Sequence, residues 1–159
     1  TVAWTGITIT VPPKTYISVR PTRHSYNIIK ESGEFVINLT PASLVKEADY
    51  CGIYTGKKVD KFAKCKLTKE QATVVSCPMI AECPVSIECK VTDIVPLGSH
   101  DMFMADIVAV NVNEELFDKD GKFHLEKADL IAYAHGEYFT LGKRLGNIGF
   151  STNKKKKKR

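Results

Sequence analysis

The chain has 159 residues, 43% of them hydrophobic, and a formal net charge of +5 at pH 7. This length fits one domain with a buried core, and no apolar run approaches the roughly 18 to 20 residues of a membrane span, so we expect a soluble protein. The six basic residues of Lys154–Arg159 leave the body with a formal charge of −1, whereas a nucleic-acid-binding domain clusters basic residues on a folded face. We therefore expect no nucleic-acid partner, and a disordered, solubilising tail over 151–159.

The cysteines and the missing motifs exclude several kinds of chemistry. There are five cysteines, no CxxC pair and no secretory signal, so reduced thiols in a cytoplasmic protein are the simplest interpretation. Cys77, Cys83 and Cys89 are evenly spaced, but zinc ligands come in pairs about two to four residues apart, and Pro78 and Pro84 interrupt the segment. We predict no metal site. The absence of HExxH, GxSxG, Walker and GxGxxG patterns leaves metalloproteases, serine hydrolases, P-loop and Rossmann proteins without support.

Two strands are predicted near the start of the chain. Ile7–Val11 and Thr15–Val19 alternate apolar and polar residues, many of them β-branched, and Pro12–Pro13 separates them. This two-residue period is typical of a half-buried strand.

The segment Ser18–Tyr26 follows directly and carries Arg20 and Arg23 among hydroxyl side chains. A helix is predicted after it, over Tyr26–Gly33, with Gly33 suited to the position just beyond its end. Guanidinium groups match phosphate oxygens, and hydroxyls and backbone N–H groups at a helix start add donors. Two interpretations remain open: a phosphate clamp at a strand-to-helix junction, or a solvated basic turn.

The middle of the chain reads as a strand, a helix and a basic connection. Glu34–Leu39 is strand-like, and its Asn38 either makes a local turn hydrogen bond or serves a site. Pro41–Tyr50 is predicted to be helical. In the connection Lys57–Phe62, Lys61 either reaches a phosphate or faces water.

The second half is dominated by extended segments, and His100 lies in a hairpin loop between two of them. This histidine either donates a hydrogen bond or assists proton transfer, or it is an ordinary exposed loop residue. Many short antiparallel strands with a few short helices predict a mainly β protein built as a closed or split β-barrel. The expected extended segments are Gln71–Ala81, Val85–Pro96, Met102–Asn113 and Ala132–Ala134.

Three segments, in this order, resemble the flavin reductase-like family of FMN-binding split barrels: Thr1–Gly6, Ser18–Tyr26 and Ser32–Leu39. Four further segments extend the resemblance over nearly the whole chain: Asp49–Gly52, Val59–Phe62, Ile80–Val85 and Leu97–Asp101. The family normally has a first strand before the position of Thr1, so we expect an FMN-binding split-barrel domain over 1–150 that lacks this strand.

The resemblance also implies a set of site residues around one FMN per subunit, bound near the interface of a homodimer. Backbone groups of the first residues would bond the pyrimidine edge of the flavin, and the clamp would hold its phosphate. His100 would lie where a nicotinamide approaches. The cofactor-binding residues implied in this way are Val2, Ala3, Trp4, Thr5, Arg20, Pro21, Thr22, Arg23, Ser25, Tyr26, Asn38, Leu39 and Lys61.

The function implied is that of an oxidoreductase that moves electrons from NAD(P)H through FMN to an acceptor. An alternative is a flavoredoxin-type carrier, which holds FMN and exchanges electrons with a redox protein partner without oxidising NAD(P)H. A third possibility is a binding module that uses the basic tail.

Overall fold

The computed structural model describes residues 4–152, so the predicted site residues Val2 and Ala3 lie outside the described part of the chain. The main elements are β1 (Thr5–Thr10), β2 (Pro13–Val19), α1 (His24–Ser32), β3 (Glu34–Leu39), α2 (Val45–Ile53), α3 (Lys61–Cys65), β4 (Lys69–Glu70), β5 (Met79–Ile80), β6 (Val85–Pro96), β7 (Asp101–Val112), β8 (Ile131–Ala134) and β9 (Glu137–Thr140). Four short 3-10 helices are η1 (Ala42–Leu44), η2 (Glu114–Leu116), η3 (Leu125–Ala128) and η4 (Phe150–Thr152).

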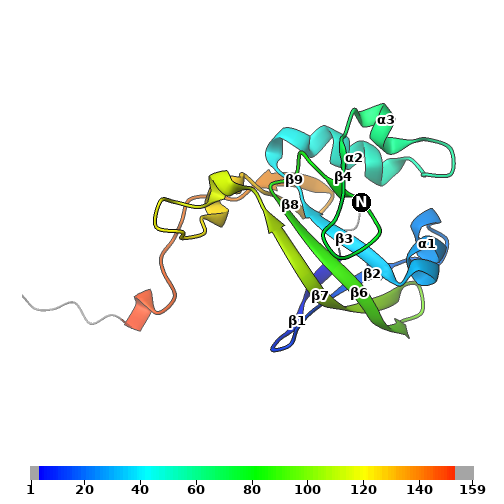
Figure 1. The fold of residues 1–159 in the computed structure, drawn as a ribbon, viewed down its shortest axis with the longest axis horizontal. Helices are drawn as coiled ribbons and strands as arrows, with labels where there is room; N and C mark the ends of the chain where they lie inside the picture. Colours follow the sequence, from blue (N-terminus) through cyan, green and yellow to red (C-terminus); the bar gives the residue numbers. More distant parts are fainter. Residues whose placement is uncertain (1–3, 153–159) are drawn as a thin grey trace, which may run out of the picture.

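The fold is mainly β, with antiparallel sheets, as predicted (Figure 1). A five-stranded sheet has the order β1-β2-β7-β6-β3, and two-stranded sheets are formed by β4 with β5 and by β8 with β9. Because β1 and β3 lie at opposite edges and are not paired with each other, the described strands form an open sheet. The expectation of a closed barrel is therefore not met within residues 4–152.

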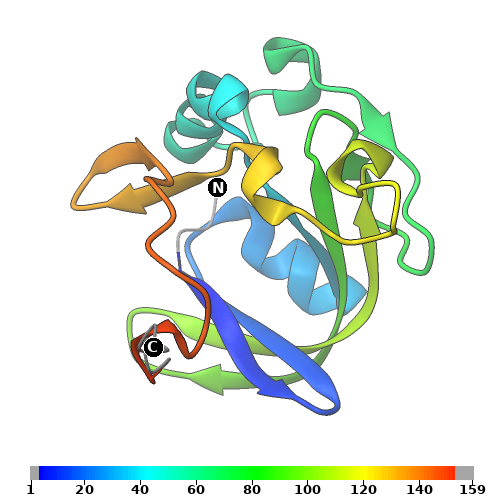
Figure 2. The same ribbon diagram turned by 90° about the vertical axis from the view of Figure 1, so that its left-hand side faces the viewer.

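The core lies between this sheet and α1, which crosses the curved sheet in Figure 2. Ile17 and Val19 of β2 are buried at alternate positions, as the two-residue period predicts. They pack with Tyr26 of α1 and with Phe103 of β7, which is fully buried. Burial of one such large side chain contributes roughly 1.5 to 3 kcal/mol, so this cluster fixes α1 and the end of β2 relative to each other.

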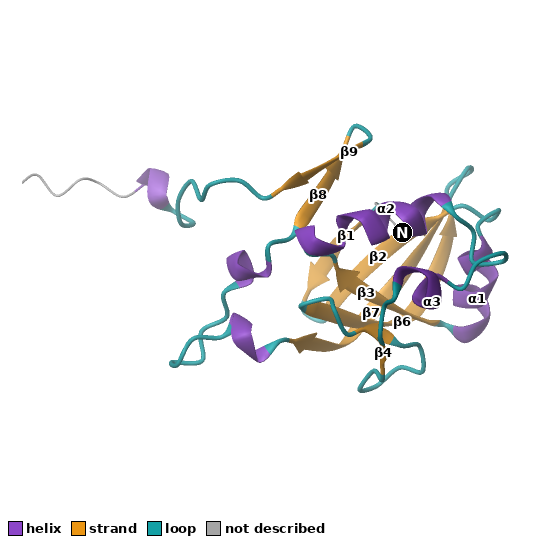
Figure 3. Ribbon diagram, turned by 90° about the horizontal axis from the view of Figure 1, so that it is seen from above, coloured by secondary structure: helices purple, strands orange, loops and turns teal. Residues whose placement is uncertain are grey.

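The helices differ from the predicted ranges at their ends. α1 begins two residues earlier than predicted, at His24, and Gly33 follows it in the left-handed conformation with φ of 68°, as expected for this position. The second helix is divided into η1 and α2. α3 begins within the stretch 57–62 that was predicted to be a basic connection and continues beyond it to Cys65. At its start, the Asp60 side chain accepts a hydrogen bond from the N–H of Ala63 (3.2 Å). Figure 3 shows α1 and α3 towards the same end of the sheet.

The prediction of a continuous extended segment over 71–81 is wrong, and Glu88 supplies the reason. The Glu88 carboxylate on β6 is fully buried and accepts hydrogen bonds from the backbone N–H groups of Thr73, Val74 and Val75 and from Asn111. Burial alone raises the pKa of Glu88, but these four donors outweigh burial and lower the pKa to about 2. Residues 73–75 therefore wrap around an anion, and within 71–81 only Met79–Ile80 pairs as a strand, β5.

The remaining differences are small. β3 and β6 have the predicted bounds, β7 begins one residue earlier than expected, and β9 was not predicted. Among residues 4–152, no helix is long and apolar enough to cross a membrane.

Candidate functional site

A strongly cationic cavity of about 1080 Å³ lies where β2 ends and α1 begins. The loop between α2 and α3 forms its other wall. Asp60 is the one carboxylate among its described lining residues, and this side chain is engaged in capping α3. Such an excess of positive charge within one cavity attracts anions. The six basic side chains that line it are Arg20, Arg23, Lys57, Lys58, Lys61 and Lys69.

The clamp residues reach this cavity because of a tight turn after β2. Val19 is anchored in the core, and the N–H of Arg23 then donates to the carbonyl of Arg20 (2.9 Å). The turn places both guanidinium groups and the side chains of Thr22 and Ser25 in the cavity wall, at the start of α1. These side chains thus line a cavity although they are exposed to solvent, and phosphate binding by them stays a prediction.

His100 joins the same cavity from the β6–β7 turn. Its ring is 4.4 Å from the ring of Trp4, centroid to centroid, and its Nε2 accepts a hydrogen bond from Nε of Arg20 at 3.3 Å. Because arginine can only donate, the proton of a neutral His100 belongs on Nδ1, which lies 2.9 Å from the hydroxyl of Ser99. Residues 80 positions apart in the chain are thus joined in the lining of the cavity.

Lys61 faces the cavity from the first turn of α3. Its Nζ donates to the backbone carbonyl of Cys51 at 2.6 Å, near the end of α2, where the helix leaves carbonyl groups unpaired. This contact holds α3 against α2.

Three further lysines line the cavity but were not predicted from the sequence: Lys57, Lys58 and Lys69. The basic composition of 57–61 was a signal for the first two. No sequence pattern pointed to Lys69.

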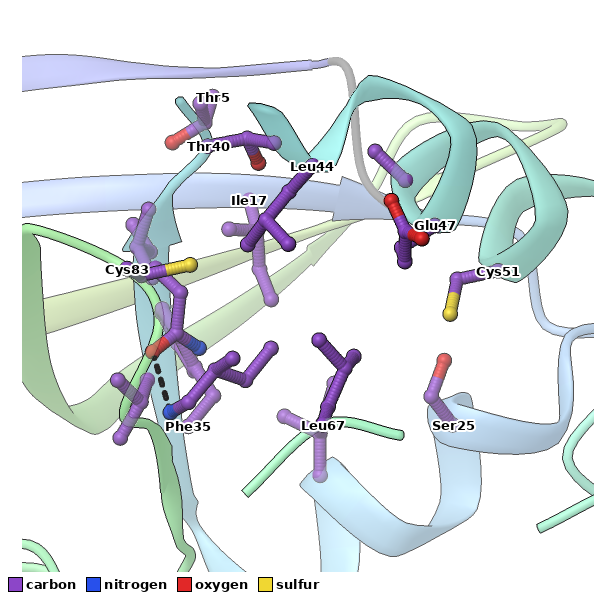
Figure 4. A pocket seen from close by; sticks show the side chains of 16 residues that line it. Thr5, Ile17, Ser25, Phe35, Thr40, Leu44, Glu47, Cys51, Leu67 and Cys83 are labelled. Carbon is purple, nitrogen blue, oxygen red and sulfur yellow. Dashed lines mark hydrogen bonds between the residues drawn. The ribbon is translucent and has the colours of Figure 1, made fainter. Parts of the chain in front are cut away.

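A second, mostly apolar cavity of about 340 Å³ adjoins the first, and Ser25 and Cys51 line both (Figure 4). It lies between α2, β3 and residues 67–83. The predicted site residues Thr5 and Asn38 line this second cavity.

Asn38 has a structural role in addition to lining the second cavity. Its amide oxygen accepts hydrogen bonds from the N–H of Ile80 (3.0 Å), drawn dashed in Figure 4, and from the hydroxyl of Ser86 (2.9 Å). The expected local turn hydrogen bond is not among these contacts, because both partners lie more than 40 positions away along the chain. A contact between Asn38 and a ligand stays a prediction.

Of the predicted cofactor-binding residues that the structure describes, three line neither cavity. Leu39 packs against the cluster around Val85 and Leu116, and Pro21 lies in the turn of the clamp. Tyr26 is buried in the core and donates its hydroxyl to Asp101 at 2.5 Å; this hydrogen bond, together with burial, raises the pKa of Tyr26. A contact between these three side chains and a ligand stays a prediction.

The comparison with protein families identifies the chain. The model described as "Flavin reductase like domain" matches residues 1–142. The chain belongs to the flavin reductase-like family. This flavin reductase-like chain is 31% identical over 124 residues to a protein of Archaeoglobus fulgidus, a match that covers 78% of the chain and 69% of that protein.

Two solved structures are similar to this chain. The chain is 34% identical to flavoredoxin of Desulfovibrio vulgaris (Miyazaki F), with a TM-score of 0.87 over 96% of this chain and 82% of the flavoredoxin. A flavin reductase with a split barrel domain from Shewanella frigidimarina NCIMB 400 gives a TM-score of 0.81 at 23% identity, over 92% and 75% of the two chains. The second likeness shows the fold alone.

Proposed function

We propose that this flavin reductase-like protein binds FMN, with the phosphate in the cationic cavity and the isoalloxazine ring in the adjoining apolar one. The observation that carries the proposal is the pairing of these two cavities, joined at Ser25 and Cys51. FMN has the same two parts, a phosphate at one end and a flat, largely apolar ring at the other. A split barrel, as in the Shewanella relative, is the proposed architecture of the complete domain.

The protein's own groups bind and orient this ligand, and the bound flavin supplies the redox chemistry. Arg20 and Arg23 offer planar forks of donors to the phosphate, and Thr22 and Ser25 offer hydroxyls beside them. Lys61 adds a positive charge from the opposite wall. The Trp4–His100 ring pair lies in the lining of the cavity, where a nicotinamide is proposed to approach.

We propose NAD(P)H as the electron donor, which makes the protein an NAD(P)H-dependent flavin reductase. The second candidate is a carrier that exchanges electrons with a protein partner, and the 34% identity to a flavoredoxin favours it. A homodimer and a cytoplasmic location belong to the same proposal.

Two measurements on the purified protein test this assignment. Titration with FMN should give a stable yellow complex, and a protein that takes up no FMN would contradict the flavin assignment. The loaded protein is then mixed with NADH or NADPH without oxygen while flavin absorbance is followed. Rapid bleaching by either donor is expected of a reductase, whereas bleaching by neither leaves the carrier function.

A further inference from the structure

Glu47 points from α2 into the apolar cavity (Figure 4). Its Oε2 atom is shielded from solvent and has no hydrogen-bond partner, and among residues 4–152 it is the one buried side-chain oxygen or nitrogen in this condition. A buried polar atom without a partner costs free energy, and a charged one costs more. The Glu47 carboxylate therefore lacks a hydrogen bond as long as no donor enters the cavity.

Among residues 4–152, no protein group donates to this oxygen. The hydroxyl of Thr5 already donates to the carbonyl of Tyr16 at 2.8 Å, and the amide oxygen of Asn38 is an acceptor that serves two other groups. Much of the remaining lining is apolar, including Ile17, Phe35 and Leu44. A ligand that enters the cavity with a donor group can supply this missing hydrogen bond.

We propose that Glu47 accepts a hydrogen bond from the imide N–H of the flavin, at N3 on the pyrimidine edge of the ring. This inference rests on the proposed function, because it assumes that the ring occupies the apolar cavity. The oxidised isoalloxazine carries a single N–H donor, at N3, and a mostly apolar cavity with one unpaired buried side-chain acceptor among its described lining residues matches that pattern. The hydroxyls of the ribityl chain match the polar cavity beside the clamp instead.

A carboxylate at this edge has a second consequence. Reduction places additional electron density on the pyrimidine part of the flavin, and a nearby negative charge opposes it. Glu47 therefore selects flavins with a free N3–H and also holds the midpoint potential of the bound flavin down.

The test compares FMN with FMN methylated at N3, each titrated into the wild-type protein and into Glu47→Leu, with flavin fluorescence as the readout. We expect the wild type to bind FMN at least about tenfold more tightly than the N3-methyl compound, since hydrogen bonds to charged groups are among the stronger ones. In Glu47→Leu this preference should fall to about twofold or less. Glu31→Gln, an exposed glutamate on α1, is the matched control and should keep the wild-type preference.

An equal preference for FMN in the wild type and in Glu47→Leu would overturn the role of Glu47. So would equal binding of both flavins by the wild type, the result expected if a water molecule satisfies the carboxylate. Failure of the wild type to bind FMN at all would instead refute the proposed function, so the two failures are distinguishable. Glu47→Gln, which keeps the size and an acceptor oxygen, should raise the midpoint potential of bound FMN, and an unchanged or lower potential also contradicts the proposal.

Discussion

Arg20 and Arg23 are the residues on which the proposed phosphate site depends most. Both side chains line the cationic cavity, and the turn that carries them is anchored in the core through Val19. Their position near the start of α1 adds backbone N–H groups to the donors available for an anion. The basic segment that was identified in the sequence thus lines a cavity in the folded protein.

Replacement of either arginine by alanine should weaken FMN binding by about 1.5 to 3 kcal/mol, the value of a hydrogen bond to a charged group. Fluorescence titration measures the loss, and binding of wild type should also weaken as salt rises. Arg144→Ala, an exposed residue outside both cavities, serves as the control and should bind FMN like the wild type. Unchanged affinity in Arg20→Ala/Arg23→Ala would show that the phosphate binds elsewhere.

Glu88 is the residue that most affects stability, because its buried carboxylate anchors Thr73, Val74 and Val75. Glu88→Gln should lower the free energy of unfolding by about 3 kcal/mol, since an amide cannot accept from all four donors. Urea denaturation measures this loss, with Glu31→Gln as an exposed control. A loss below about 0.5 kcal/mol, within the usual range of surface substitutions, would contradict this role.

The acid stability of the protein should also depend on Glu88. The folded pKa is about 2 and the ordinary value is 4.5, so the ionised carboxylate stabilises the fold fully above pH 4.5. This contribution is lost as the pH falls from 4.5 through 2. Denaturation midpoints measured across this interval should fall more steeply for the wild type than for Glu88→Gln.

Among the elements, the sequence patterns predicted the bounds of the strands more accurately than the ends of the helices. The two-residue alternation of β2 and the run of apolar residues in β6 reflect burial against the same core, so sequence and structure agree there. α1 begins at His24 although Arg23, the residue before it, makes no side-chain capping hydrogen bond. Contact of Tyr26 with the core decides the start of this helix, and no local cap signal reports such a contact.

The connection between β7 and β8 should respond to pH through His124. Its Nε2 lies 2.9 Å from Asp118 and its Nδ1 2.7 Å from Glu126, and these two contacts raise the pKa of His124 above the ordinary 6.5. The same pairing with His124 lowers the pKa of Asp118 to about 2. Protonated His124 therefore stabilises the connection fully below pH 6.5, and this contribution is lost as the pH rises through the raised pKa.

Amide hydrogen exchange measures this effect at Lys122, whose N–H donates to the Asp118 carboxylate at 2.9 Å. After correction for intrinsic rates, protection of this amide should decrease as the pH rises through the pKa of His124. His124→Gln should remove the dependence. The amide of Val91, which donates to Gly33 within the main sheet, is the internal reference and should not respond. An equal response of both amides would contradict a local role for His124.

At the scale of the whole molecule, the edge strand β1 bears on the proposed homodimer. Ile7, Ile9 and Val11 at this edge are 63%, 44% and 83% exposed. Unpaired edge strands with apolar side chains are prone to association. This exposure supports a dimer, which the family resemblance leads us to propose.

Sedimentation equilibrium of the purified chain should therefore give about twice the mass of one chain, 17.7 kDa. Ile7→Lys together with Ile9→Lys should shift the protein towards monomer, because these changes replace the exposed apolar side chains that a partner would cover. Thr8→Lys, on the same strand but not part of the apolar set, is the control. A monomeric wild type at micromolar concentration would contradict the dimer.

Short sequence segments were enough to predict a mainly β fold, most strands and the donor groups of the clamp, because alternation, glycine positions and the donor geometry of arginine are local properties. Which of these residues meet depends on long-range packing. The contact of Arg20 with His100 spans 80 positions, and Lys69 and Glu47 reach the two cavities through the packing of α2 and α3 beside the sheet. Burial of Tyr26 and the unpaired oxygen of Glu47 likewise depend on what packs around them, which no local pattern records.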